Sequence, residues 1–173
     1  MVKAIPILLL FISLGFSITI YQYPGANLER SVGQKEYALI SQILNKAKKE
    51  LSIPYVQSVT IYECRNLIEF KEITNEPYYV GGIYKDGFII MQPFEILRKK
   101  KLLRKILAHE ILHYFIEQKY KPPIWLEEGY IEYILNDIPK ELEGYHKIYL
   151  KQFLKKVIDE KKDIFVVFNN YKR

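Results

Sequence analysis

The chain has 173 residues, of which 49% are hydrophobic, so it is long enough for one domain with its own core and too short for two typical domains. Its single cysteine, Cys64, excludes a disulfide framework and a cysteine-based structural zinc site, and we expect this residue to be a small buried hydrophobe. The net charge of +6 suits anionic surroundings, but no basic stripe is interleaved with aromatic residues, so we expect no nucleic-acid partner.

The N-terminal segment differs from the rest of the chain. Lys3 precedes a run of residues, 4–20, that contains no charge. A short basic start and an apolar run are typical of a signal peptide, with a weak cleavage signal after Ser17, and the run could also nearly span a bilayer as an anchor. We therefore expect residues 1–23 to be a signal peptide or N-terminal membrane anchor, with membrane association through residues 4–20. Residues 24–173 are then exported, as a periplasmic, extracellular or membrane-anchored domain that faces outward.

The first part of this domain predicts a helix followed by strands. Tyr-Pro-Gly at 23–25 breaks the apolar run, and we expect a short polar linker after it. Apolar residues recur at helical spacing from Val32 to Leu51. They alternate with polar residues in VQSVTIY at 56–62, and further along they flank Lys85-Asp86-Gly87, a hairpin turn signal. The predicted elements are a helix over 32–51, a strand over 56–62, a short helix over 66–74, and strands over 80–84 and 88–91.

The second part predicts helices only. Pro93 introduces a helical stretch, and Pro122-Pro123 separates two longer helices. The predicted helices cover about residues 100–118, 124–135 and 142–159, and the tail over 164–173 could be a strand or a helix end. This order of elements predicts an α+β fold in which a small sheet packs beside helices.

The motif His-Glu-Ile-Leu-His lies on the first of these long helices, at residues 109–113. Because residues four apart share a helix face, His109 and His113 can reach one ion, and zinc suits imidazole ligands. Glu110 lies about a quarter-turn further round, where it can take the proton of a zinc-bound water that attacks a carbonyl. The alternative is an apolar helix with two hydrogen-bonded histidines, which is costly because two buried imidazoles and a carboxylate need partners.

A third ligand is available in the segment IWLEEGYIEY at 124–133, which carries Glu127, Glu128 and Glu132. Together with the motif, this segment resembles the gluzincin metallopeptidases, the group that includes thermolysin and the zinc aminopeptidases. The resemblance covers about residues 80–135. In that group, a glutamate on the next helix is the third zinc ligand, commonly in a W-L-x-E-G context. The resemblance thus implies Glu128 as the third ligand beside the two histidines, with Glu110 as the general base.

Glu127 is the competing third ligand. Neighbours on a helix point about 100° apart, so only one of the two can face the metal, and Glu128 is the one that directly precedes Gly129. A glycine at that position would also let the two helices approach closely. Glu132 lies one turn beyond Glu128, where the resemblance implies a carboxylate that holds His109, although it could equally face solvent.

The resemblance also implies a donor for the oxyanion and a strand that binds substrate. The donor would be a tyrosine or histidine downstream of the third ligand, and we take Tyr145 and His146 as the candidates, with Tyr149 nearby. The strand would be an edge strand ahead of the zinc helix that pairs with an extended peptide, and residues 88–91 are expected to form it.

We therefore expect a single minimal zincin-like peptidase domain, in which a small, mostly antiparallel sheet packs against a helical half that carries the HExxH helix and the third-ligand helix. Its expected function is zinc-dependent hydrolysis of peptide bonds in a peptide or protein substrate. Two alternatives stay open: a non-catalytic, zinc-stabilised exported scaffold or binding protein, and an adhesion or assembly protein whose tyrosine-rich surface binds envelope components without metal. The sequence leaves the substrate, the choice between internal and terminal cleavage, and the oligomeric state open.

Overall fold

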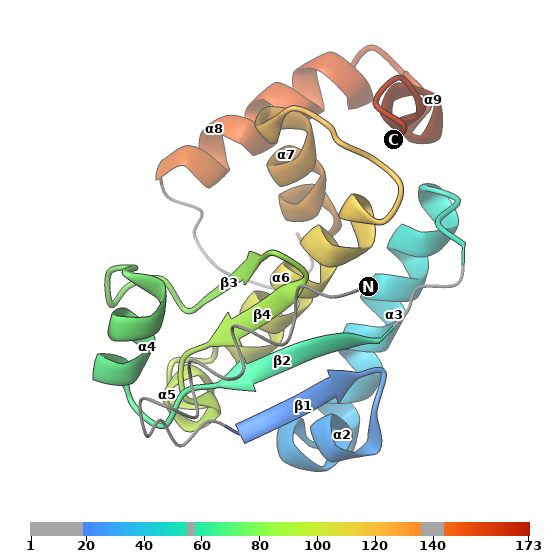
Figure 1. Ribbon diagram of the computed structural model, residues 1–173. Helices are drawn as coiled ribbons and strands as arrows, with labels where there is room; N and C mark the ends of the chain where they lie inside the picture. The colour runs from blue at the N-terminus through green and yellow to red at the C-terminus, as the bar shows by residue number, and fades with distance from the viewer. Residues whose placement is uncertain (1–18, 55–57, 136–143) are drawn as a thin grey trace.

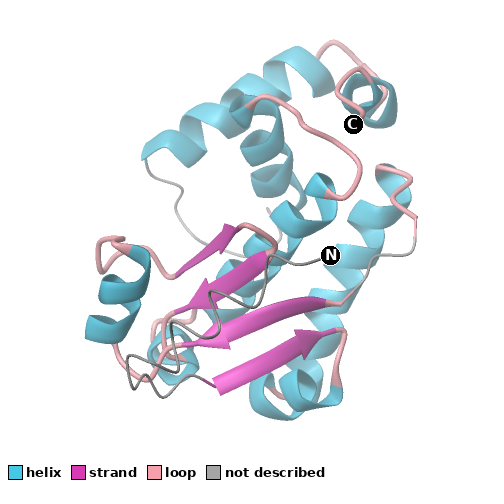
Figure 2. Cartoon of the chain, in the orientation of Figure 1, coloured by secondary structure: helices cyan, strands magenta, loops and turns pink. Residues whose placement is uncertain are grey.

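The computed structural model describes residues 19–54, 58–135 and 144–173, and over these residues the chain is an α+β fold with eight α-helices and one four-stranded sheet (Figure 1 and Figure 2). The strands are β1 (Thr19–Tyr23), β2 (Val59–Glu63), β3 (Gly82–Lys85) and β4 (Phe88–Met91). Their order in the sheet is β1-β2-β4-β3. The β1/β2 and β3/β4 pairs are antiparallel and β2/β4 is parallel, so the sheet is mixed.

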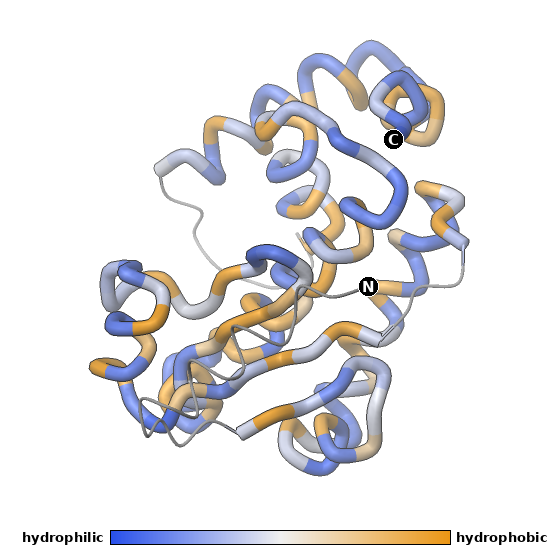
Figure 3. Tube along the Cα trace, viewed as in Figure 1, coloured by the Kyte–Doolittle hydropathy of each residue, from blue (hydrophilic) through white to orange (hydrophobic). Residues whose placement is uncertain are grey.

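The β3–β4 hairpin is confirmed, but the predicted edge strand is wrong. Asp86 and Gly87 have φ values of 52° and 86°, the left-handed conformations that a tight hairpin turn requires. Because β4 pairs with β2 on its other side, residues 88–91 lie inside the sheet, and β3 forms the edge. The apolar sequence FIIM of β4 fits this central position, and Figure 3 shows the strand as a hydrophobic run.

The α-helices alternate with the strands in the first half of the chain and follow one another in the second half. They are α2 (Ala26–Val32), α3 (Gln34–Glu50), α4 (Leu67–Thr74), α5 (Phe94–Lys99), α6 (Leu103–Glu117), α7 (Ile124–Ile134), α8 (Gly144–Phe153) and α9 (Ile164–Asn169), with a π-helical turn η1 (Leu154–Ile158) after α8.

Several boundaries differ from the sequence expectation for local backbone reasons. The polar linker expected after Tyr-Pro-Gly is helix α2, and Gly33, with a φ of 94°, separates it from α3. Lys101, with a φ of 57°, ends the turn after α5, so α6 begins at Leu103 rather than near residue 100. The tail is a helix, because the Asp163 side chain caps α9 by accepting a hydrogen bond from the Val166 N–H.

The N-terminal segment expected over residues 1–23 ends inside the sheet. Its last five residues form β1, where Tyr23 is buried and the Tyr21 ring stacks on Phe94 with centroids 5.2 Å apart. Residues 19–23 therefore belong to the sheet although they lie ahead of the expected boundary, and residues 1–18 lie outside the described residues. Among the helices that the structure describes, none has the length and hydropathy needed to cross a membrane.

Helix α6 lies at the centre of the core. It packs against α3, against strands β3 and β4 of the sheet, and against α7. Leu107, Ala108, Ile111 and Leu112 are fully buried, so most of its circumference is covered. Helices α7 and α8 pack closely together at one end of the molecule (Figure 1). Cys64 is buried and free, as expected from the sequence.

Candidate metal centre

The two histidines of the HExxH motif lie side by side on α6. They are one turn apart, and their ring centroids are 4.8 Å apart. Their Nε2 atoms approach to 3.0 Å, and both rings are largely buried. The helix thus presents two imidazole nitrogens to one point.

Glu128 of α7 faces both of these nitrogens. Its Oε2 lies 3.4 Å from Nε2 of His109, and its Oε1 lies 3.4 Å from Nε2 of His113. The structure therefore brings together the three residues expected from the sequence as ligands, with one carboxylate oxygen facing each imidazole.

Glu127, the competing ligand, has a different partner. Its Oε1 lies 2.7 Å from Nδ1 of His113, the ring nitrogen that does not face Glu128. Burial acts to lower the pKa of His113, but the bond to Glu127 and the nearby Glu128 carboxylate outweigh it and raise this pKa to about 10. Glu127 therefore orients His113, as carboxylates commonly orient metal-binding histidines.

Glu132 lies behind His109 in the corresponding place, but beyond hydrogen-bond distance. It is 3% exposed, so it does not face solvent, and its Oε1 lies 3.6 Å from Nδ1 of His109. Its Oε2 accepts a hydrogen bond from Nζ of Lys105 at 2.8 Å. Burial alone would raise the pKa of Glu132, but His146 and Lys105 beside it lower this pKa to about 2. Lys105 was absent from the sequence prediction, although it lies four residues before His109 and so shares the face of the two histidines.

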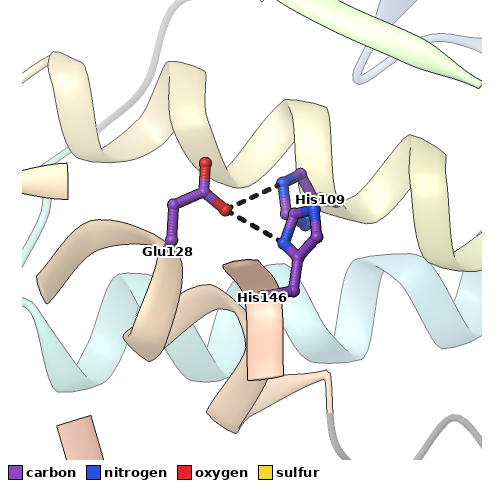
Figure 4. Close-up of side chains that lie close together, drawn as sticks. All are labelled: His109, Glu128 and His146. Atoms are coloured by element: carbon purple, nitrogen blue, oxygen red, sulfur yellow. Dashed lines mark ion pairs between the residues drawn. The ribbon is translucent and has the colours of Figure 1, made fainter. Parts of the chain in front are cut away.

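His146 of α8 joins the cluster, and Tyr145 does not. Nδ1 of His146 lies 3.3 Å from Oε1 of Glu132 and 3.5 Å from Oε2 of Glu128. Ligand atoms of His109, Glu128 and His146 all lie within 4.8 Å of one another, and Figure 4 shows the carboxylate pointing at both rings. The side chain of Tyr145 is 74% exposed, and its ring stacks on Tyr149 instead.

Gly129 explains how α8 comes so close. A Cβ atom on this residue would lie 2.5 Å from Cβ of Phe153 and 2.6 Å from the carbonyl oxygen of Tyr149. The glycine therefore serves the contact between α7 and α8, rather than the contact between the motif helix and α7 that the sequence suggested. This close packing is what delivers His146 to the cluster.

Glu110 is buried on the side of α6 that faces the edge strand. Burial raises the pKa of its carboxyl to about 7, although His113 and the backbone of Tyr84 act to lower it. A Cβ atom on Gly82 would lie 3.3 Å from Cγ of Glu110 and 2.5 Å from Sδ of Met91. The close approach of β3 to the motif helix therefore depends on Gly82, a role that the sequence prediction missed although the pair Gly81-Gly82 lies inside the predicted strand over 80–84.

One buried oxygen of the cluster has no hydrogen bond. The Glu128 and Glu132 carboxylates are balanced by cations, because Lys105 pairs with Glu132 and the raised pKa values keep His113 and His146 protonated. Oε2 of Glu128 is buried and accepts no hydrogen bond among the described residues, although nitrogens of His109 and His146 lie 3.4 Å and 3.5 Å away. A divalent metal would give this oxygen a partner, and its binding would release the proton of His113.

A cavity of about 220 Å³ opens beside Glu127. Its lining also includes Tyr84 from β3, Asp86 from the hairpin turn and Glu117 from the end of α6. The Tyr84 hydroxyl donates a hydrogen bond to Glu117, which ties the edge strand to the motif helix at this point. The cavity therefore borders the edge strand and reaches the cluster at Glu127, the carboxylate that contacts His113.

Two imidazoles and one carboxylate, with carboxylates behind the imidazoles, are the donor set of many catalytic zinc sites. The sequence had named Glu127 and His146 as candidates, and the structure adds their contacts: Glu127 with His113, and His146 with Glu132. Comparisons with protein-family models, with curated proteins and with solved structures found no match to this chain.

Proposed function

We propose that this chain is a zinc-dependent metallopeptidase with a minimal zincin-like fold, in which His109, His113 and Glu128 hold the zinc. The observation that carries the proposal is the convergence of the two Nε2 atoms, 3.0 Å apart, on the Glu128 carboxylate, each of whose oxygens lies 3.4 Å from one of them. The carboxylates of Glu127 and Glu132 behind the two imidazoles support the same assignment.

The order of elements supports the zincin-like part of the proposal. An edge strand, β3, lies antiparallel to its neighbour and packs on the motif helix α6, and the next helix, α7, carries the third ligand. An extended peptide can pair with the free side of such a strand. In this proposal, β3 takes the substrate-binding role that the sequence suggested for residues 88–91.

The residues of the chain divide the chemistry among them. Zinc supplies a Lewis acid that polarises the scissile carbonyl and makes a water more acidic. The Glu110 carboxylate accepts the proton of the attacking water, a role that suits a carboxyl whose pKa burial raises to about 7. His146 is the residue that can donate a hydrogen bond to the developing oxyanion, because the Glu128 and Glu132 carboxylates raise its pKa to about 9.

The proposed setting is an exported compartment, with residues 4–20 as the signal or anchor. This part of the proposal rests on the uncharged run after Lys3. The substrate is then a peptide or protein outside the cytoplasm.

Glu110→Gln tests the function. We expect the variant to keep its zinc and to lose hydrolysis of unstructured peptides by about 10²- to 10⁴-fold, the usual contribution of a general base. Glu95→Gln is the matched control, because Glu95 is exposed on α5 and should leave turnover unchanged. Normal turnover in Glu110→Gln would reject the mechanism. A zinc-loaded wild type without turnover would favour a non-catalytic scaffold.

A further inference from the structure

The outer face of α8 and η1 is basic and partly apolar. Residues 144–158 contain four lysines and no acidic residue. The side chains of Tyr145 and Ile148 are 74% and 56% exposed, which is unusual for such large apolar groups on one short helix. Lys147 and Lys151 are also exposed.

These residues share one side of the helix because the other side is fixed on α7. Phe153 is fully buried, and Gly129 of α7 contacts the backbone of Tyr149. Lys147, Lys151 and the exposed Lys155 follow at intervals of four residues, and Ile148 lies next to the first two. Figure 3 shows hydrophilic and hydrophobic residues alternating along this outer helix.

We propose that this face, formed by Tyr145, Lys147, Ile148, Lys151 and Lys155, docks on an anionic lipid surface. A helix with a lysine-rich face and exposed apolar side chains lies at the headgroup boundary, where the apolar groups are buried and the lysines meet lipid phosphates. Each lysine near such a surface strengthens binding by about fivefold at moderate ionic strength. An acidic protein partner would satisfy the lysines but would leave the exposure of Ile148 unexplained.

A second feature of the chain points to the same partner. The uncharged run over residues 4–20 could nearly span a bilayer, and as an uncleaved anchor it would hold the domain that follows it near lipid. Docking through α8 would hold the metal cluster close to the lipid headgroups, because His146 projects from the inner side of the same helix. Docking would make the substrate a membrane-proximal polypeptide. That consequence rests on the proposed function, whereas docking itself does not.

The test uses the full chain with a dye that reports the polarity of its surroundings, attached to Ile148→Cys. The native Cys64 is 1% exposed and should not react with the dye. The label is read with vesicles of phosphatidylcholine, with and without phosphatidylglycerol. We expect a shift to apolar surroundings only with the anionic vesicles, and we expect salt to reverse it. Ile68→Cys is the matched control, because Ile68 is 62% exposed on the separate helix α4 and should show no shift.

Lys147→Gln with Lys151→Gln tests the charge argument in the same labelled chain. The double variant should dock about 25-fold more weakly, from about fivefold for each lysine. The proposal is overturned by equal shifts at positions 148 and 68, by equal shifts with and without phosphatidylglycerol, or by unchanged docking of the double variant. A shift with soluble polyglutamate but not with anionic vesicles would assign the face to an acidic protein and would also overturn it. None of these readouts depends on peptidase activity, so failure of docking and failure of the proposed function are distinguishable.

Discussion

Gly129→Ala should destabilise the protein even though alanine is the better helix former. Helix propensity alone predicts a gain of about 1 kcal/mol for this change inside α7. The added Cβ atom would lie 2.5 Å from Cβ of Phe153 and 2.6 Å from the backbone oxygen of Tyr149, roughly 1 Å inside ordinary contact distance. Because a backbone oxygen cannot rotate away, α8 must move, and such overpacking typically costs about 1–3 kcal/mol or more. Because the obstacle is backbone, we take the upper part of that range, about 2–3 kcal/mol, and the net loss is then about 1–2 kcal/mol.

Thermal unfolding followed by circular dichroism measures this loss. For a chain of this length, each kcal/mol shifts Tm by about 2–4 °C, so we expect a decrease of several degrees. Lys151→Ala is the control, because it changes α8 on the exposed side and should stay within about 0.5 kcal/mol of the wild type. A rise in Tm for Gly129→Ala would refute the close α7–α8 contact and, with it, the placement of His146.

Two further predictions follow from particular contacts. Glu128→Gln should weaken zinc binding on the order of 10²- to 10³-fold, which follows when a binding free energy of about 10–16 kcal/mol is shared among four coordination positions. Glu127→Gln should weaken it only about 10- to 100-fold, because Glu127 contacts His113 on the side away from the ion. Competition with a chelating dye gives both constants, and the opposite order would make Glu127 the ligand. Cys64 should resist alkylation at pH 8.5 in the folded chain, because burial raises its pKa to about 12 and leaves little thiolate, and it should react quickly in urea. Rapid reaction without denaturant would contradict its burial.

The convergence of His109, His113 and Glu128 could be predicted from the sequence because the geometry that produces it is local. The spacing of His109 and His113 fixes their common face on any α-helix, and only one of two neighbours on the next helix can face the same ion, which left a choice between Glu127 and Glu128. The structure assigns a role to each, with Glu128 facing both Nε2 atoms and Glu127 facing Nδ1 of His113.

Features of the fold and the site that depend on long-range packing were harder to predict from the sequence. The edge position of β3 follows from the pairing of β2 with β4, and the contrast between the apolar FIIM and the more polar GIYK was the signal that could have predicted it. The ion pair between Lys105 and Glu132 joins α6 to α7, and its partners carry no motif. Tyr145 and His146 are neighbours on one helix, so sequence alone could not decide which turns inward, and the packing of Gly129 against α8 decides it.

The central claim is that His109, His113 and Glu128 form a zinc site, and the zinc content of the purified full chain tests it most directly. Inductively coupled plasma mass spectrometry of the wild type should find about one zinc per chain, and His113→Ala, prepared in parallel, should retain little. A folded wild type that holds no zinc when zinc is supplied, or a variant that holds as much as the wild type, would contradict the account.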